Sequence, residues 1–152
     1  MAGFTNKGKY LMLRHMFNGL ALPTNFYVAL CTSAVTPTAD TNTFSDLTEI
    51  AAGNGYTAGG ISLTKNTTDF PTVTEDDTND RGSILIKNLT WTASVGNLPA
   101  SGNGARWMIL TDDNATQGSR FVYAYVDLTA DRTVSVAQNL NVNTTELRFN
   151  EV

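Results

Sequence analysis

The sequence predicts an all-β protein, an antiparallel β-sandwich or jelly-roll-like fold with one N-terminal α-helix. Two short apolar runs, Ala105–Leu110 and Phe121–Val126, are rich in β-branched and aromatic residues and flank a polar insert, as in a β-hairpin with an ordered loop. Both runs are almost continuously apolar, which indicates strands buried on both faces. Roughly seven to nine such short segments separated by turn formers follow one helical segment.

Length and composition favour one globular domain. The chain has 152 residues, which we divide into an N-terminal helical segment (1–19) and a β-sandwich domain (20–152). Charged residues are only 16% of the chain and the net charge is -4, so the clustered cations that nucleic-acid binding needs are missing. No run of 18 apolar residues occurs, so we expect no contact with a membrane.

One segment, Thr5–Asn18, has the spacing of a helix. Thr5 or Asn6 can cap its start and Gly19 can end it. Its apolar residues Tyr10, Leu13 and Phe17 fall on one face. The segment carries Lys7, Lys9, Arg14 and the sole histidine, His15, and no acid precedes Asp40. This basic helix either caps an end of its own sandwich or docks on an acidic partner surface.

The remaining segments are assigned by apolar alternation and turn residues. Pro23 prevents the helix from continuing, and the glycines between Gly53 and Gly60 indicate positive φ angles and close backbone approaches. A helical turn over Asp46–Ile50, capped by Ser45, is predicted before them. The predicted outer strands are Phe26–Thr32, Ile61–Thr64, Ser83–Thr92, two half-buried pieces with Val134 and Val136 and with Leu140 and Val142, and Glu146–Asn150.

Residues that support catalysis or metal binding are sparse. Cys31 is the only cysteine and lies in a strand-like run, so we expect a buried, unreactive thiol and no disulfide. The acidic segment Asp69–Gly82 resembles a calcium loop only superficially, because Arg81 and Asn88 occupy the fifth and twelfth positions counted from Asp77. We read it as a solvated hairpin turn. We therefore predict a protein that is not an enzyme and has no cofactor or metal.

Five stretches in a fixed order carry a resemblance to a known family: VALCTSAVTPTADT, GNGYTAGGISLT, LTWTAS, ARWMILTDDN and FVYAYVDLTADRTV. Over about Phe26 to Phe149 this order is similar to that of small tailed-phage virion proteins, which are variously decoration (cement), minor structural or tail-fibre-like proteins. The resemblance implies a protein located in the virion and assembled in the host cytoplasm. It also implies a homotrimer that contacts the major capsid protein or other virion proteins.

Two functions follow as hypotheses. The first is a capsid decoration protein that binds and stabilises the head shell. The alternative is a tail-fibre or tail-tip module that binds a receptor, for which exposed Trp and Tyr could form a glycan platform; Trp91 and Trp107, however, lie in strand-like runs and are predicted to be core. For either function we predict that Met1–Gly19 contributes to docking, through Phe4, Lys7, Lys9, Tyr10, Arg14 and Phe17.

Overall fold

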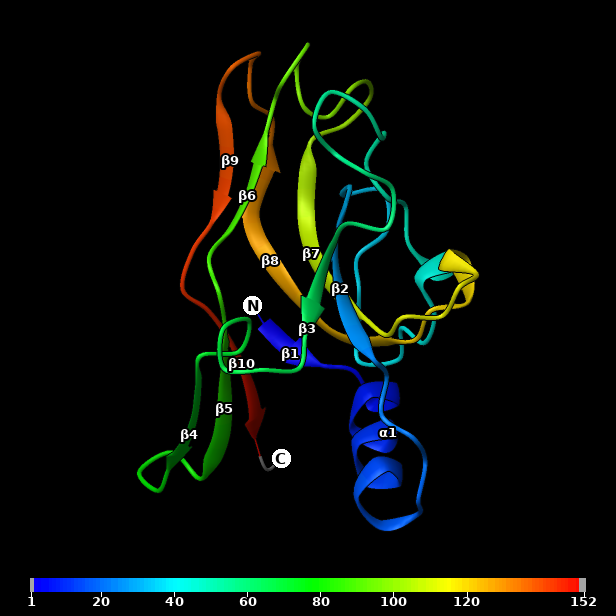
Figure 1. Ribbon diagram of the computed structural model, residues 1–152, viewed down its shortest axis with the longest axis vertical. Coiled ribbons are helices and arrows are strands. Elements are labelled where there is room, and N and C mark those ends of the chain that lie inside the picture. Colours follow the sequence, from blue (N-terminus) through cyan, green and yellow to red (C-terminus); the bar gives the residue numbers. More distant parts are fainter. Residues whose placement is uncertain (1, 151–152) are drawn as a thin grey trace.

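The computed structural model describes residues 2–150 and is mostly β, with antiparallel sheets and one α-helix in the described chain (Figure 1). The predicted all-β class with one N-terminal helix is confirmed. The helix is α1 (Asn6–Phe17), and two short 3-10 turns are η1 (Phe44–Asp46) and η2 (Gln117–Ser119). The strands are β1 (Ala2–Phe4), β2 (Asn25–Cys31), β3 (Ile61–Thr64), β4 (Thr72–Asp76), β5 (Arg81–Ile86), β6 (Leu89–Thr92), β7 (Ala105–Thr111), β8 (Val122–Arg132), β9 (Asn139–Val142) and β10 (Thr145–Asn150).

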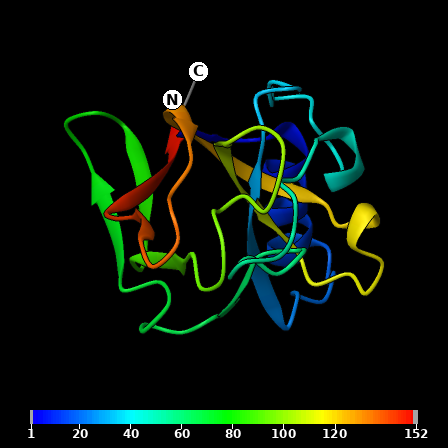
Figure 2. The ribbon, with the colours of Figure 1, turned by 90° about the horizontal axis from the view of Figure 1, so that it is seen from above.

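The strands form one large sheet and two small ones. The large sheet has the order β1-β8-β7-β2-β3, and the small sheets are β10-β5-β4 and β6-β9. Apolar residues from all three sheets share one core cluster, so the architecture is sandwich-like. In Figure 2 the small sheets lie to the left of the large sheet, and α1 lies behind it, at the end of the molecule that is lowest in Figure 1.

The centre of the large sheet is buried on both faces. Met108 and Leu110 of β7 point into the main core, while Trp107 and Ile109 point into a second cluster on the opposite face. This alternation follows from the two-residue period of a strand. The second cluster is closed by Phe44 and other residues of the 32–50 connection. The continuous apolar character of this run was therefore a correct signal of two-sided burial.

Helix α1 begins and ends as its sequence predicts. The Thr5 hydroxyl accepts a hydrogen bond from the Gly8 amide (2.9 Å) and donates one to the Val122 carbonyl (2.5 Å), so the cap also fixes the helix to β8. Gly19 has a φ of 65°, the left-handed conformation that commonly follows a helix. The face toward the core is formed by Gly8 and Leu11, not by the predicted apolar stripe.

Gly60 shows why the glycine-rich segment is needed. Its φ is 79°, and a Cβ built there would lie 1.9 Å from the Val28 carbonyl oxygen. Only glycine fits both requirements, because an L side chain is strained at that φ and would also collide with β2. The prediction of close backbone approach in this segment is confirmed.

The predicted strand Ser83–Thr92 is wrong as one element. The chain leaves the β10-β5-β4 sheet after Ile86 and enters the β6-β9 sheet at Leu89. Between the two strands, Lys87 is bound by Asp69. The backbone carbonyl of Asp69 accepts a hydrogen bond from the Lys87 amide (3.0 Å), and its carboxylate accepts one from the Lys87 ammonium (2.5 Å). The Asn88 side chain also accepts the Thr144 amide (3.0 Å). The ammonium of Lys87 holds the pKa of Asp69 below its usual range.

Two other local predictions need correction. The turn at Asp46–Ile50 is instead the 3-10 turn Phe44–Asp46, because the Asp46 carboxylate accepts the Thr43 amide (2.8 Å); this hydrogen bond lowers the pKa of Asp46. Val134 makes only an isolated bridge to Leu98, and Val136 is exposed, so no strand forms between the end of β8 at Arg132 and the start of β9 at Asn139.

The acidic segment Asp69–Gly82 contains the predicted hairpin turn. It also contains a strand before the turn, which was not predicted. Thr72–Asp76 forms β4, which pairs antiparallel with β5 at the edge of a small sheet. In the turn the Asp76 carboxylate accepts the Asn79 side chain and pairs with Arg81 (2.9 Å). This hairpin projects from the body at the end of the molecule where α1 also lies (Figure 1).

Candidate functional site

The six predicted docking residues lie at one end of the molecule but do not form one patch. Phe4 points into a cleft between α1 and the β10-β5-β4 sheet. Lys9 lies over the ring of Phe149 on β10, with its ammonium 5.7 Å from the ring centroid. Tyr10 and Phe17 are exposed on the side of α1 that faces solvent.

Three of the predicted residues, Lys7, Tyr10 and Arg14, are stacked along one side of α1. The Lys7 ammonium lies 5.5 Å and the Arg14 guanidinium carbon 5.8 Å from the centroid of the Tyr10 ring. The Lys7 ammonium also lies 4.8 Å from the ring centroid of Phe121. Cations over aromatic faces are attracted by the ring quadrupole, so these two positive charges are held near fixed positions on the helix surface.

Helix α1 is apolar on two opposite faces. The inner face contains Leu11, which is buried against the sheet. On the outer face Tyr10, Leu13 and Phe17 are three and four residues apart and are 50%, 55% and 77% exposed. A helix that is apolar on both sides is normally buried on both sides, so the outer stripe of Tyr10, Leu13 and Phe17 is a candidate contact surface.

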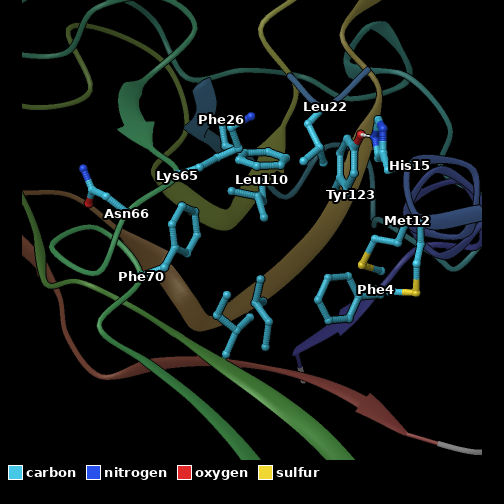
Figure 3. Close-up of a pocket in the computed structure, with 13 residues that line it drawn as sticks. Phe4, Met12, His15, Leu22, Phe26, Lys65, Asn66, Phe70, Leu110 and Tyr123 are labelled. Atoms are coloured by element: carbon cyan, nitrogen blue, oxygen red, sulfur yellow. Dashed lines mark hydrogen bonds between the residues drawn. The ribbon is translucent and has the colours of Figure 1, made fainter. Parts of the chain in front are cut away.

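The cleft beside α1 is the second candidate surface (Figure 3), with a volume of about 620 Å³. It is bounded by α1, by the start of β2, by the connection between β3 and β4, and by strands β5 and β10. Its lining is almost entirely apolar. The lining residues are Phe4, Met12, His15, Met16, Leu22, Phe26, Lys65, Asn66, Phe70, Ile84, Leu110, Tyr123 and Leu147.

A polar pair lies at the helix end of this cleft. Nδ1 of His15 lies 3.0 Å from the Leu20 carbonyl oxygen, and Nε2 lies 2.8 Å from the hydroxyl of Tyr123 (Figure 3). Because a carbonyl can only accept, Nδ1 carries the proton, and in the neutral ring Nε2 accepts from Tyr123. Burial raises the pKa of Tyr123, so its hydroxyl stays protonated. The pair ties the last turn of α1 to β8, which is a structural role.

Cys31 and both tryptophans lie in the core. Cys31 is fully buried, and this burial raises the pKa of its thiol, so the expectation of an unreactive core cysteine agrees with its environment. No group of three or more His, Cys, Asp or Glu side chains is placed to hold a metal ion within that range. Trp91 and Trp107 are 3% and 8% exposed, which confirms the prediction that both are core residues.

Sequence reasoning identified the charged side of α1 but missed other members of the site. Met16 and Leu22 are exposed at the mouth of the cleft, and Leu13 was assigned to the apolar face but not to the docking set. The apolar spacing within α1 could have found Leu13. The cleft itself had no sequence signal, because its lining combines Phe4, Phe70 and Leu147 from distant parts of the chain.

Comparison with known proteins identified no similar protein. A scan against protein-family models and searches of curated proteins and of solved structures each found no match to this chain. No helix within the described residues is long and apolar enough to cross a membrane. The resemblance to tailed-phage virion proteins therefore stays a prediction.

Proposed function

We propose that the chain is a non-enzymatic structural protein of a tailed-phage particle, most concretely a decoration (cement) protein that binds and stabilises the head shell. One observation carries the docking part of this proposal: α1 is fixed to its own sheet by one apolar face and exposes a second, formed by Tyr10, Leu13 and Phe17. The assignment to a phage particle is supported by the sequence resemblance alone.

The composition of this face fits a partner surface that is apolar and acidic. Lys7 and Arg14 flank the stripe, and no acidic residue precedes Asp40. Exposed ion pairs contribute at most about 1 kcal/mol each, and salt screens them beyond about 8 Å. Burial of the apolar stripe, at about 25 cal/mol per Å², therefore supplies most of the affinity, and the cations set orientation and association rate.

The two roles considered for the N-terminal helix belong to its two faces. Leu11 belongs to the main core and β1 pairs with β8, so the segment stabilises its own sandwich. Deleting residues 1–19 would remove these contacts together with the outer stripe. Surface substitutions on the outer stripe test docking without disturbing the core.

We expect the double substitution Leu13→Ser and Phe17→Ser to weaken binding to particles that lack the protein by at least about tenfold, since each buried apolar side chain contributes about 1.5–3 kcal/mol. Co-sedimentation with particles measures the binding, and urea unfolding checks that stability is unchanged. The control is Val95→Ser, which removes an exposed valine from the β6–β7 loop at the opposite end of the molecule (Figure 1). Equal binding of the wild type and the double variant would contradict docking through α1.

Location and copy number are tested separately. Antibody labelling over the whole head supports the decoration protein, whereas labelling confined to the tail supports the alternative of a tail-fibre or tail-tip module. The resemblance implies a homotrimer, and multivalent attachment would convert weak single contacts into stable occupancy. Sedimentation equilibrium of the free protein is expected to give a mass three times that of the chain; a strict monomer at high concentration would contradict it.

A further inference from the structure

Three Asn-Gly pairs occur in the sequence, and their surroundings in the structure differ. An Asn-Gly pair can deamidate without an enzyme, because glycine has no side chain to keep the asparagine side chain away from the next backbone amide. The reaction needs an asparagine side chain that is free to turn and a backbone amide that solvent can reach and deprotonate. The contacts of each pair therefore decide which one reacts in the folded protein. The pairs are Asn18-Gly19, Asn54-Gly55 and Asn103-Gly104.

The pair Asn54-Gly55 is held in place by hydrogen bonds on both sides. The two residues are the centre of a tight turn, in which the Gly53 amide donates to the Tyr56 carbonyl (2.8 Å). The Tyr56 amide donates back to the Gly53 carbonyl (3.0 Å). The side chain of Asn54 also donates to the Asn97 carbonyl (2.8 Å). The Asn54 side chain cannot reach the Gly55 amide until hydrogen bonds of this turn break.

The pair Asn103-Gly104 is restrained at its glycine. Asn103 is exposed, but Gly104 is buried. A Cβ built on Gly104 would lie 2.8 Å from the carbonyl oxygen of Arg132 and 2.9 Å from its amide nitrogen, so the backbone of this glycine packs against β8. Solvent reaches a buried amide less readily than an exposed one, so deprotonation of the Gly104 amide, and with it deamidation of Asn103, is slowed.

The pair Asn18-Gly19, directly after α1, has neither restraint. Both residues are exposed, and a Cβ built on Gly19 would have no neighbour within 4 Å. Within residues 2–150 no hydrogen bond holds the Asn18 side chain or the Gly19 amide. For the attack the peptide bond after Asn18 must turn. This rotation breaks one backbone hydrogen bond, from the Leu20 amide to the Arg14 carbonyl (3.2 Å), at a helix end, where such bonds open readily.

We infer that Asn18 is the deamidation site of the folded protein and that its reaction modifies the docking end of the molecule. The Gly19 amide loses its proton to hydroxide, and its nitrogen attacks Cγ of Asn18. The side-chain nitrogen takes up a proton from water and leaves as ammonia, and a cyclic succinimide remains. Water then opens this ring at one of its two carbonyl carbons, which leaves aspartate or isoaspartate in place of Asn18. No electron is transferred, and hydroxide and water are the only reagents.

The product carries a new negative charge beside the outer stripe, because Asn18 directly follows Phe17. A carboxylate at the C-terminal end of a helix is unfavourable, since the unpaired backbone carbonyls already make that end negative. The carboxylate would also face the acidic partner surface, and this step rests on the proposed function. Deamidation is therefore expected to weaken the docking of protein that has aged before assembly.

Incubation of the free protein at mildly alkaline pH tests the site. Mass spectrometry of proteolytic peptides, with isoaspartyl methyltransferase labelling, follows each pair over time. Deamidation at Asn18 is expected to be at least about tenfold faster than at Asn54, since each hydrogen bond that must break lowers the reactive population. In urea all three pairs are expected to react at similar rates, because only their shared sequence remains. Reaction at Asn54 or Asn103 as fast as at Asn18 in the folded protein would overturn the inference.

The substitution Asn18→Asp tests the effect on docking, with co-sedimentation as the measurement. We expect particle binding about two- to fivefold weaker than that of the wild type, the range for an unfavourable charge in the last turn of a helix. The matched control is Asn103→Asp, which adds the same charge to the β6–β7 loop at the opposite end of the molecule (Figure 1) and is expected to bind like the wild type. Equal binding of the two variants would overturn the effect on docking. A wild type that does not bind particles would contradict the proposed function, whereas the order of reaction of the three pairs is measured without particles.

Discussion

Replacing Trp107 with alanine is expected to lower the free energy of unfolding by about 3–5 kcal/mol, the range for deleting a large buried aromatic side chain. Trp107 is 8% exposed and belongs to the cluster on the second face of the large sheet. Its ring packs edge-on against Tyr125 at 6.2 Å between centroids, and it lies opposite Cys31 in the register of β2 and β7. Urea unfolding followed by circular dichroism measures the loss.

The matched control is Trp107→Phe. The indole N–H is buried and makes no hydrogen bond to any residue of the described chain, so removing it leaves no partner unsatisfied. Phenylalanine keeps an aromatic ring beside Tyr125, and we expect a loss below about 2 kcal/mol. A loss below about 1 kcal/mol for the alanine variant would mean that the indole is accessible in solution, and a glycan-binding platform would regain support.

Much of the fold follows from apolar patterning. The run that became β7 is continuous in apolar residues because its sheet lies between two core clusters, and this was predictable. The start and end of α1 followed from Thr5 and Gly19, whose roles are local. Elements that depend on a distant partner were missed. Strand β1 is three residues long and exists because Gly3 pairs with Tyr125, and β4 is polar apart from Val73 and exists because it pairs with β5.

The candidate site was predictable in its charge but not in its shape. The absence of acids before Asp40 identified the basic helix. Helical periodicity found the stripe of Tyr10, Leu13 and Phe17 but could not tell whether it faces the core or solvent. That choice is made by Gly8, whose missing side chain allows the helix backbone to approach β8. Because the Gly8 side of the helix faces β8, the stripe of Tyr10, Leu13 and Phe17 on the other side faces solvent.

Replacing Gly8 with valine is expected to destabilise the protein by about 3 kcal/mol, at the upper end of the usual cost of overpacking. A Cβ at position 8 would lie 2.2 Å from the carbonyl oxygen of Tyr123 and 2.8 Å from its carbonyl carbon. These atoms belong to the backbone of β8, so α1 must move away as a unit. That movement would also strain the hydrogen bonds of Thr5 to Val122 and to the Gly8 amide.

The control for this substitution is Gly3→Val in β1. A Cβ at Gly3 would have no neighbour within 4 Å, and valine favours extended backbone, so the free energy of unfolding is expected to change by less than about 0.5 kcal/mol. Urea unfolding compares the two variants. Because the outer stripe moves with the helix, Gly8→Val is also expected to weaken particle binding under conditions where the protein remains folded. If Gly8→Val were as stable as the wild type, the close packing of α1 on β8 would be disproved, and with it the assignment of the outer face of the helix as the exposed one.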